Sequence, residues 1–162
     1  MRLVLVAGLA ATLVAAPAAA QIAKPTQAEQ EAAAAAVASA CGGDVSSDEA
    51  AKMPRAAIAA KLSCFTREAA KRFNTQLPQK VDEVTVLERV SAEGTRLTYH
   101  YTVDLLVADL PAGTSEAMQT GVRANVCKAD DMRATMALGG SYRYVWIDRN
   151  RKPITEAVVS GC

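Results

Sequence analysis

The sequence has few of the residues and motifs on which most enzyme active sites depend. Its 162 residues include a single histidine, His100, so any nucleophile–histidine site would have to use that one imidazole. The chain has no G-x-S-x-G motif, no G-x-x-x-x-G-K phosphate loop and no H-E-x-x-H zinc motif. We therefore expect no enzyme, no catalytic residue and no cofactor, and a hydrolase that uses His100 is the weakest of our hypotheses.

Closely spaced cysteines are also absent. The four cysteines are Cys41, Cys64, Cys127 and Cys162, and without C-x-x-C pairs or further histidines they predict no metal site. They instead indicate disulfides formed in an oxidising compartment. Four cysteines allow three pairings, and we favour Cys41–Cys64 with Cys127–Cys162 because each pair then lies within one half of the protein. In the loop-entropy model, each bridge stabilises the fold by roughly 3 kcal/mol.

Long apolar runs are missing from all but the first segment of the chain. Arg2 precedes an apolar run over residues 3–16, and the small residues 18–20 precede Gln21, which is the pattern of a signal peptide cleaved near Ala20. A transmembrane anchor is the competing interpretation, but the run is Ala-rich and shorter than the roughly 20 apolar residues that span a bilayer. We expect a periplasmic or secreted protein with no integral membrane segment after cleavage.

Removal of residues 1–20 leaves a chain without net charge. The remaining 142 residues carry 17 basic and 17 acidic side chains, because Arg2 is the only charged residue removed. A neutral balance argues against a nucleic-acid partner, which would require a broad basic surface. The length fits one main domain. We assign residues 21–45 to an Ala-rich helix and linker and residues 46–162 to an α+β domain.

The spacing of apolar residues predicts the elements of this domain. Helical periodicity predicts helices over residues 27–40, 46–53, 54–77, 114–126 and 130–138. Alternation with a period of two predicts strands within residues 81–90, 97–105, 142–147 and 154–159. With the Ala-rich helix and the long helix as its first two elements, the order α-α-β-β-α-α-β-β predicts a four-stranded, mainly antiparallel sheet in an α+β domain, with helices packed on one or both faces.

Aromatic residues are few, and most of them lie on two of the predicted strands. Five of the seven are on strands, namely Tyr99, Tyr101, Tyr142, Tyr144 and Trp146. If the two strands are neighbours, the rings form a cross-strand cluster that receives the helix carrying Phe65 and Phe73. Alternatively, the polar tips of tyrosine and tryptophan edge a groove for a ligand. The candidate binding surface is His100 with Tyr142, Tyr144 and Trp146.

Two polar features, His100 and the turn at residues 149–152, are outside the aromatic cluster. His100 alternates with the tyrosines of its strand and so faces the other side of the sheet, where a solvent-facing or pH-responsive contact is expected. Residues 149–152 form a small basic turn with Arg143 nearby. Such a turn is usually only solvated, and its alternative role is contact with anionic lipid or cell-wall groups.

The second half of the chain resembles small exported proteins of Gram-negative bacteria that have no assigned function. The matching stretches are Leu77-Pro78, Val81-Asp82-Glu83-Val84-Thr85, residues 97–102, Val126-Cys127, Met132-Arg133, Tyr142-Arg143-Tyr144 and Cys162. More faintly, the chain is similar to the quorum-sensing-regulated virulence factor family, whose fold is a profilin-like α/β sandwich. The resemblance implies that Cys127 and Cys162 are partners, and it carries over no catalytic residue.

These observations together predict a protein that acts by binding. The first hypothesis is a non-catalytic periplasmic domain that contacts an envelope protein or peptide through the aromatic sheet or a free strand edge. The alternative is a binder of a small apolar or glycan ligand between the sheet and the helices.

Overall fold

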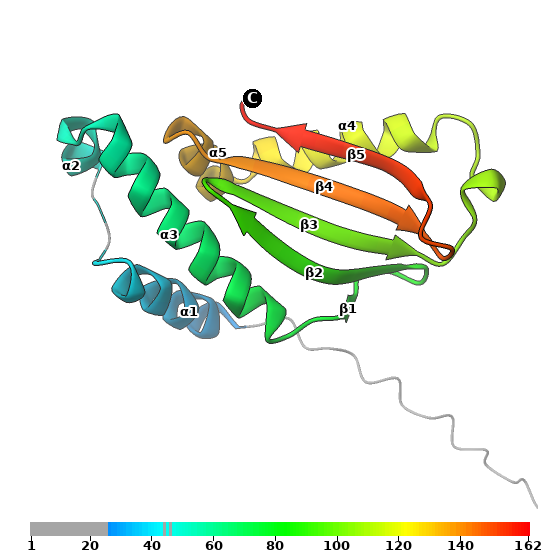
Figure 1. Cartoon of the computed structure of the whole chain (residues 1–162), viewed down its shortest axis with the longest axis horizontal. Helices are drawn as coiled ribbons and strands as arrows, with labels where there is room; N and C mark the ends of the chain where they lie inside the picture. The colour runs from blue at the N-terminus through cyan, green and yellow to red at the C-terminus, as the bar shows by residue number, and fades with distance from the viewer. Residues whose placement is uncertain (1–25, 44, 46) are drawn as a thin grey trace, which may run out of the picture.

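A computed structural model describes residues 26–43, 45 and 47–162, so the expected signal peptide at residues 1–20 lies outside the described part. In chain order the elements are α1 (Gln27–Ala40), α2 (Ser47–Lys52), α3 (Arg55–Asn74), β1 (Gln79–Lys80), β2 (Thr85–Glu93), β3 (Arg96–Val103), the short 3-10 helix η1 (Val107–Asp109), α4 (Thr114–Lys128), α5 (Asp130–Ala137), β4 (Ser141–Asp148) and β5 (Pro153–Val159). Figure 1 shows a single twisted sheet, with α1 beside α3 and with α4 beside β5.

The described strands form one mixed sheet in the order β1-β2-β3-β4-β5. Neighbouring strands are antiparallel except β3 and β4, which are parallel. The prediction of four strands was therefore wrong, whereas mainly antiparallel pairing holds for all neighbours but β3 and β4. Strand β1 has only two residues, too few to show an alternating pattern. Strands β3 and β4 are parallel because α4 and α5 form the crossover between them, which returns the chain to the same end of the sheet.

Local sequence explains where the main elements begin. Pro54 immediately precedes α3, where its missing amide hydrogen would have no helical partner anyway. Gly113 precedes α4 with a φ of 84°, a left-handed conformation that glycine adopts without the steric penalty of a side chain. The β2–β3 hairpin turns at Gly94, whose φ is 53°. These positions match the predicted starts and turns to within a few residues.

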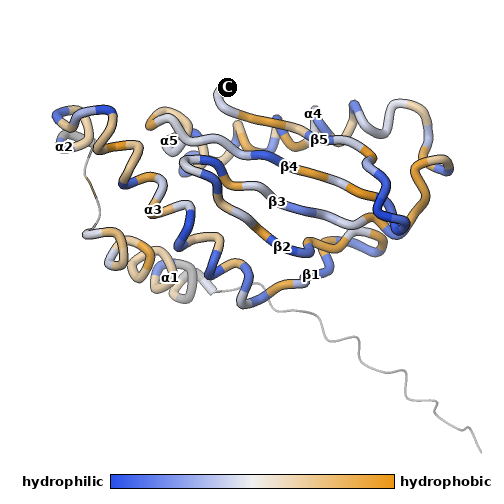
Figure 2. The backbone as a smooth tube through the Cα atoms, in the orientation of Figure 1, coloured by the Kyte–Doolittle hydropathy of each residue, from blue (hydrophilic) through white to orange (hydrophobic). Residues whose placement is uncertain are grey.

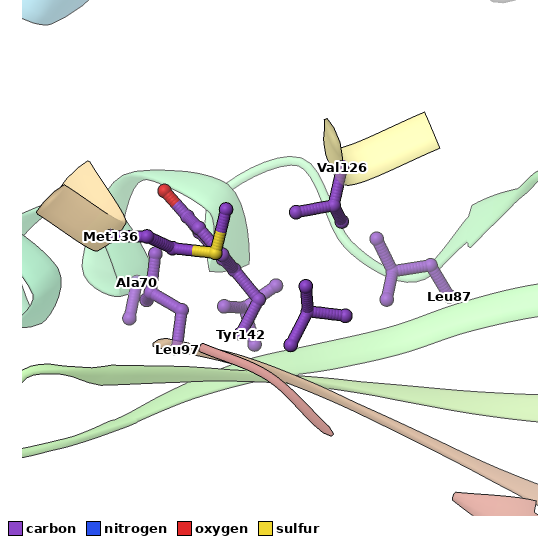
Figure 3. Close-up of a cluster of buried hydrophobic side chains, with 8 residues drawn as sticks. Ala70, Leu87, Leu97, Val126, Met136 and Tyr142 are labelled. Atoms are coloured by element: carbon purple, nitrogen blue, oxygen red, sulfur yellow. The ribbon is translucent and has the colours of Figure 1, made fainter. Parts of the chain in front are cut away.

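The hydrophobic core lies on one face of the sheet. Figure 3 shows Ala70 of α3, Val126 of α4 and Met136 of α5 approaching Leu97 and Tyr142 from the same side. The other buried members of this cluster are Leu87, Val90 and Val159. Burying a valine or leucine side chain stabilises a fold by roughly 1.5–3 kcal/mol. Packing of three helices on this face therefore leaves the opposite, outer face of the sheet with its polar and half-buried residues.

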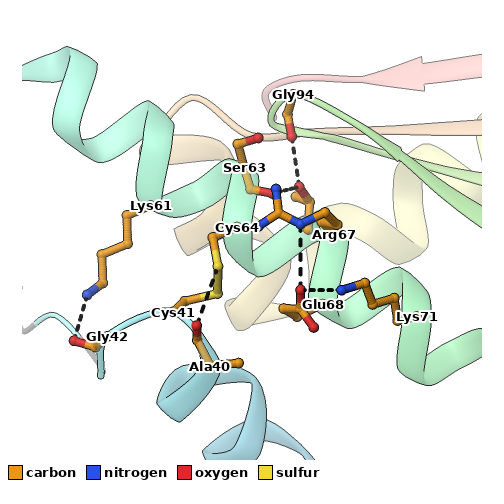
Figure 4. Close-up of a disulfide and its surroundings, with 11 residues drawn as sticks. Ala40, Cys41, Gly42, Lys61, Ser63, Cys64, Arg67, Glu68, Lys71 and Gly94 are labelled. Atoms are coloured by element: carbon orange, nitrogen blue, oxygen red, sulfur yellow. Dashed lines mark hydrogen bonds and ion pairs between the residues drawn. A yellow bond between two sulfur atoms is a disulfide. The ribbon is translucent and has the colours of Figure 1, made fainter.

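Two disulfides connect elements that are distant in sequence, and both expected pairings are confirmed. Cys41 at the end of α1 is bonded to Cys64 of α3, and Cys127 of α4 is bonded to Cys162 at the C-terminus. Figure 4 shows the first bridge with the neighbouring bond from Lys61 Nζ to the Gly42 carbonyl oxygen. Helix α1 thus lies along α3, as expected for an Ala-rich helix that covers another element.

Candidate functional site

His100 lies on the outer face of the sheet, next to Arg89 of β2 and Val145 of β4 in the strand register. Arg89 Nη2 is 3.3 Å from His100 Nδ1, and Ser91 Oγ is 3.0 Å from His100 Nε2. A guanidinium group can only donate hydrogen bonds, so Nδ1 must be the accepting nitrogen. The proton of the neutral imidazole is therefore on Nε2, which donates to the Ser91 hydroxyl oxygen.

This arrangement is the reverse of a catalytic serine–histidine pair. In such a pair, the histidine nitrogen facing the serine accepts the hydroxyl proton, and the other nitrogen donates to a carboxylate. Here the nitrogen facing Ser91 carries the proton and the other nitrogen faces a cation. Burial, followed by the charges of Arg89 and Arg143, lowers the pKa of His100 below its usual value. The Ser91–His100 contact thus gives no support to the hydrolase hypothesis.

A trough of about 560 Å³ is open on this outer face. It is lined from three directions, by Glu88 and Arg89 of β2, by residues of β3 and β4, and by Arg151 of the β4–β5 turn. The β3 and β4 side chains that line it on the outer face are His100, Thr102, Val145 and Ile147. Figure 2 shows that the β4–β5 turn is strongly hydrophilic. The trough therefore combines cationic side chains with a partly apolar lining.

The aromatic members of the predicted binding surface lie on the opposite face, toward the helices. Tyr142 and Trp146 are each only 6% exposed, and Tyr144 is half-buried. The parallel register places Tyr144 directly beside Tyr99, and their rings stack with centroids 5.0 Å apart. The structure therefore does not bring His100 together with the three aromatic residues, because adjacent positions of a strand point to opposite faces.

The aromatic cluster behaves as part of the core. Tyr101 stacks on Trp146 at 5.6 Å, and Phe73 of α3 meets the edge of Tyr99 at 6.1 Å. Burial raises the pKa of Tyr101 to about 12 and raises that of Tyr99 further. These rings form the predicted cross-strand cluster, and only one of the two phenylalanines, Phe73, makes a ring contact with it.

The other phenylalanine, Phe65, lines an apolar pocket of about 230 Å³ at the opposite end of α3. The pocket lies between α2, α3 and the end of α5, and α3 supplies Ile58, Lys61 and Leu62 along with Phe65. The remaining lining residues are Val45, Ala50, Met53, Thr135 and Leu138. Leu138 is 45% exposed, so part of the apolar lining is open to a partner. From the sequence we instead expected Phe65 to pack on the aromatic cluster together with Phe73.

At both edges of the sheet, helix side chains form hydrogen bonds with part of the edge strand's backbone. Asn74 of α3 bonds to the outward-facing backbone of Val90 in β2. On β5, the Gln119 amide donates to the Glu156 carbonyl oxygen and Ser115 Oγ donates to the Ile154 carbonyl oxygen. These contacts reduce the backbone groups available for strand addition by a partner, which was one of the predicted binding modes.

Within residues 26–43, 45 and 47–162, no three His, Cys, Asp or Glu side chains are grouped so that they could hold a metal ion. In the same part of the chain, no helix combines the length and the apolar character needed to cross a bilayer.

Comparison with known proteins identifies structural relatives and no sequence family. No protein-family model matches the chain. No curated protein matches it either. Among solved structures, the type II secretion system pilotin AspS of Vibrio cholerae is 20% identical, with a TM-score of 0.51 over 64% of this chain and 93% of its own. The EpsS pilotin from the type 2 secretion system of Vibrio vulnificus is 14% identical, with a TM-score of 0.55 over 63% of this chain and 90% of its own.

A third similar structure is a candidate secreted protein of Pseudomonas aeruginosa. It is 18% identical, with a TM-score of 0.56 over 63% of this chain and 91% of its own. At these identities the likeness establishes the fold alone. The chain therefore has the fold of two secretion-system pilotins and of a bacterial protein described as a candidate for secretion.

Proposed function

We propose that this chain is an exported, non-catalytic binding domain that holds a peptide segment of an envelope protein. The observation that carries the proposal is the open apolar pocket between α2, α3 and α5. Ile58, Leu62 and Phe65 are all half-buried there, and Leu138 is 45% exposed. Exposed apolar side chains gathered in one pocket mark a contact site more often than scattered ones do.

The size of the pocket favours apolar side chains of a peptide over a complete small ligand. Its volume of about 230 Å³ is below the range of roughly 300–1,000 Å³ typical of small-molecule sites. A peptide or helix that places one or two apolar anchors in such a pocket gains most of its binding energy there. The alternative hypothesis, a binder of a small apolar or glycan ligand between the sheet and the helices, has less support because stacked rings fill that layer.

The helix that supplies four residues of the pocket, α3, is tied to the end of α1. The Cys41–Cys64 bridge joins the two helices, and Lys61 Nζ, from a residue that lines the pocket, donates a 3.3 Å bond to the Gly42 carbonyl oxygen. A side of the pocket formed by one continuous helix loses little conformational freedom when a partner binds, which favours affinity. The fold of the two pilotins adds support by analogy, since their names place them in a secretion machinery.

Export is part of the same proposal. We propose that residues 1–20 are a signal peptide, that cleavage occurs near Ala20, and that the mature protein acts in the periplasm or after secretion. The two disulfides support this location, because an oxidising compartment preserves such bonds. Intact-mass measurement of the protein recovered from the periplasmic fraction tests it. A mass that includes residues 1–20 would contradict the cleavage.

The binding proposal is tested by changing one exposed apolar residue of the pocket and one elsewhere. Leu138→Glu places a carboxylate at the pocket, and Val158→Glu places one on β5, where Val158 is 49% exposed. Both variants should fold, because neither side chain is buried. We expect an envelope protein that is captured by the wild type and by Val158→Glu to be lost with Leu138→Glu, as measured by crosslinking and mass spectrometry.

Two results would overturn the proposal. One is capture of the same proteins by both variants, which would mean that the pocket makes no contact. The other is a small molecule that co-purifies in native mass spectrometry and is displaced by Leu138→Glu, which would favour the ligand-binding alternative.

A further inference from the structure

The outer trough lies on the face of the sheet opposite the helices, away from the apolar pocket. Its cationic side chains come from separate elements, with Arg89 on β2 and Arg151 in the β4–β5 turn. Among the described residues, neither guanidinium group is within ion-pair distance of a carboxylate. Arginine groups without carboxylate partners in a shared hollow are suited to an oxyanion, because the planar guanidinium matches its oxygens.

The other charges near His100 do not cancel the positive charges of Arg89 and Arg151. Arg143 of β4 faces the same side but is paired with Glu156 of β5, so these two side chains neutralise each other. Glu88 lines the trough and offsets one of the two remaining arginines. The trough is therefore left with a net positive charge. His100 can add to it, because a bound anion favours the protonated form of the imidazole.

The turn holds Arg151 in an unfavourable backbone conformation. Its φ is 64°, in the left-handed region where glycine is the favoured residue. The turn is fixed by Asp148, whose carboxylate accepts hydrogen bonds from the backbone amides of Asn150 and Lys152, both at 2.8 Å. Glycine would adopt this conformation without the steric cost that an arginine side chain carries.

We propose that the outer trough binds a small, soluble phosphate-bearing molecule, with the phosphate held by Arg89 and Arg151 and the rest of the molecule on Val145 and Ile147. The volume of about 560 Å³ lies within the range of small-molecule sites. Thr102 supplies a hydroxyl group to the same lining. A phosphate monoester has three terminal oxygens that can accept hydrogen bonds from two guanidinium groups at once, whereas a carboxylate has two.

His100 provides a direct reporter for this site. It is the only histidine in the sequence, so in a protein without a histidine tag its imidazole signal in ¹H NMR is unambiguous. Arg89 and Arg143 lower the pKa of His100 in addition to the effect of burial. A bound phosphate opposes those charges, so the pKa should rise by about 1 unit when glycerol 3-phosphate replaces sodium chloride at equal ionic strength. Linkage requires the reciprocal effect, in which protonation of His100 tightens the binding of the phosphate dianion.

The decisive variant is Arg151→Gly. It removes the charge while giving the turn the residue that its φ favours, so the protein should fold at least as well as the wild type. We expect Arg151→Gly to abolish most of the rise in the pKa of His100. Arg123→Gln, on the exposed side of α4, should keep the full rise, because Arg123 does not line the trough.

Other outcomes would overturn the proposal. An equal pKa of His100 in glycerol 3-phosphate and sodium chloride would exclude the site. An equal rise in Arg151→Gly and the wild type would place the anion elsewhere, and an equal rise in sodium acetate would remove the preference for phosphate. Binding to vesicles containing phosphatidylglycerol, with no response to glycerol 3-phosphate, would replace the small ligand with a membrane surface.

Discussion

Asn74 pairs with the backbone of Val90 in the way that a neighbouring strand would. Its Nδ2 donates to the Val90 carbonyl oxygen at 2.7 Å, and its Oδ1 accepts from the Val90 amide at 2.9 Å. Strand β1 covers β2 only at Val86 and Leu87, so beyond them this edge has no strand partner in the part of the chain that the structure describes. The last residue of α3 thus closes the edge of the sheet next to the start of β1.

Asn74→Ala should destabilise the protein by about 1–3 kcal/mol, because it removes two hydrogen bonds and leaves both backbone groups of Val90 without them. Urea unfolding measures the effect. Gln76→Ala, two residues further on, is the control and should change stability by less than about 0.5 kcal/mol. A similar loss in both variants would show that the cost arises from the helix end and not from the edge contact.

Gly140 and Gly121 should respond in opposite directions to substitution by alanine. A Cβ at Gly140 would lie 2.6 Å from Thr135 Cγ2 and 2.9 Å from the Thr135 carbonyl oxygen, whereas one at Gly121 meets nothing within 4 Å. Gly140→Ala should therefore cost about 1–3 kcal/mol through overpacking. Gly121→Ala should stabilise α4 by about 0.5–1 kcal/mol. Thermal unfolding of both variants tests the pair, and stabilisation by Gly140→Ala would contradict the packing at the start of β4.

Asp148 should make stability depend on pH in the acidic range. Its side chain is fully buried. Burial alone would raise the pKa, but bonds from the backbone amides of Lys152, Val107 and Asn150, with the Lys152 charge, lower it below its usual value. A lowered pKa means that the stabilisation is present above the unfolded-state pKa of about 4 and is lost as pH falls further.

Asp148→Asn should accordingly lower the Tm at pH 7, and the difference from the wild type should shrink as pH falls from about 5 to 2. The exposed Asp109 provides a control, and Asp109→Asn should leave the shape of the Tm profile unchanged. A constant difference between Asp148→Asn and the wild type across this range would mean that the carboxylate charge has no role.

The bridge between Cys127 and Cys162 should stabilise the protein because the loop that it closes has less conformational freedom in the unfolded state. The two cysteines are 35 positions apart in the sequence, for which the loop-entropy model gives about 4 kcal/mol. The double variant Cys127→Ala/Cys162→Ala should lose about this free energy of unfolding in guanidinium chloride. The Cys41–Cys64 bridge closes 23 residues, so its removal should cost nearly as much. A loss under 1 kcal/mol in either case would rule out this account of that bridge.

Much of the secondary structure follows from local sequence. The 20 residues of α3 lie between Pro54 and Pro78, where a missing amide and a steric restriction limit a helix. The alternation around Tyr99 placed β3 to within two residues at each end. The two-residue β1 and the 3-10 helix η1 were not predicted, because neither is long enough to show a period.

The candidate sites were harder to predict than the elements. No pattern in the sequence marked Leu138 as a residue of a binding site. It lies in the same pocket as Ile58 and Phe65 only because the fold brings the end of α5 close to α3. Arg89 and Arg151 lie 62 positions apart and meet in the outer trough because of the strand order. The alternation along β3 correctly predicted that His100 lies on the other face of the sheet from the tyrosines. Its contacts with Arg89 and Ser91 could not be predicted, because they depend on the register of β2.

The sequence by itself determined the features that depend on neighbours along the chain. These are the helices, the longer strands, the separation of His100 from the tyrosines, and the motifs that are missing. The tertiary structure alone decided the parallel pairing of β3 with β4, the closed edge at Asn74, the apolar pocket and the outer trough. The physical reason is that periodicity and propensity act over a few residues, whereas pairing and packing join residues that only the complete fold brings together.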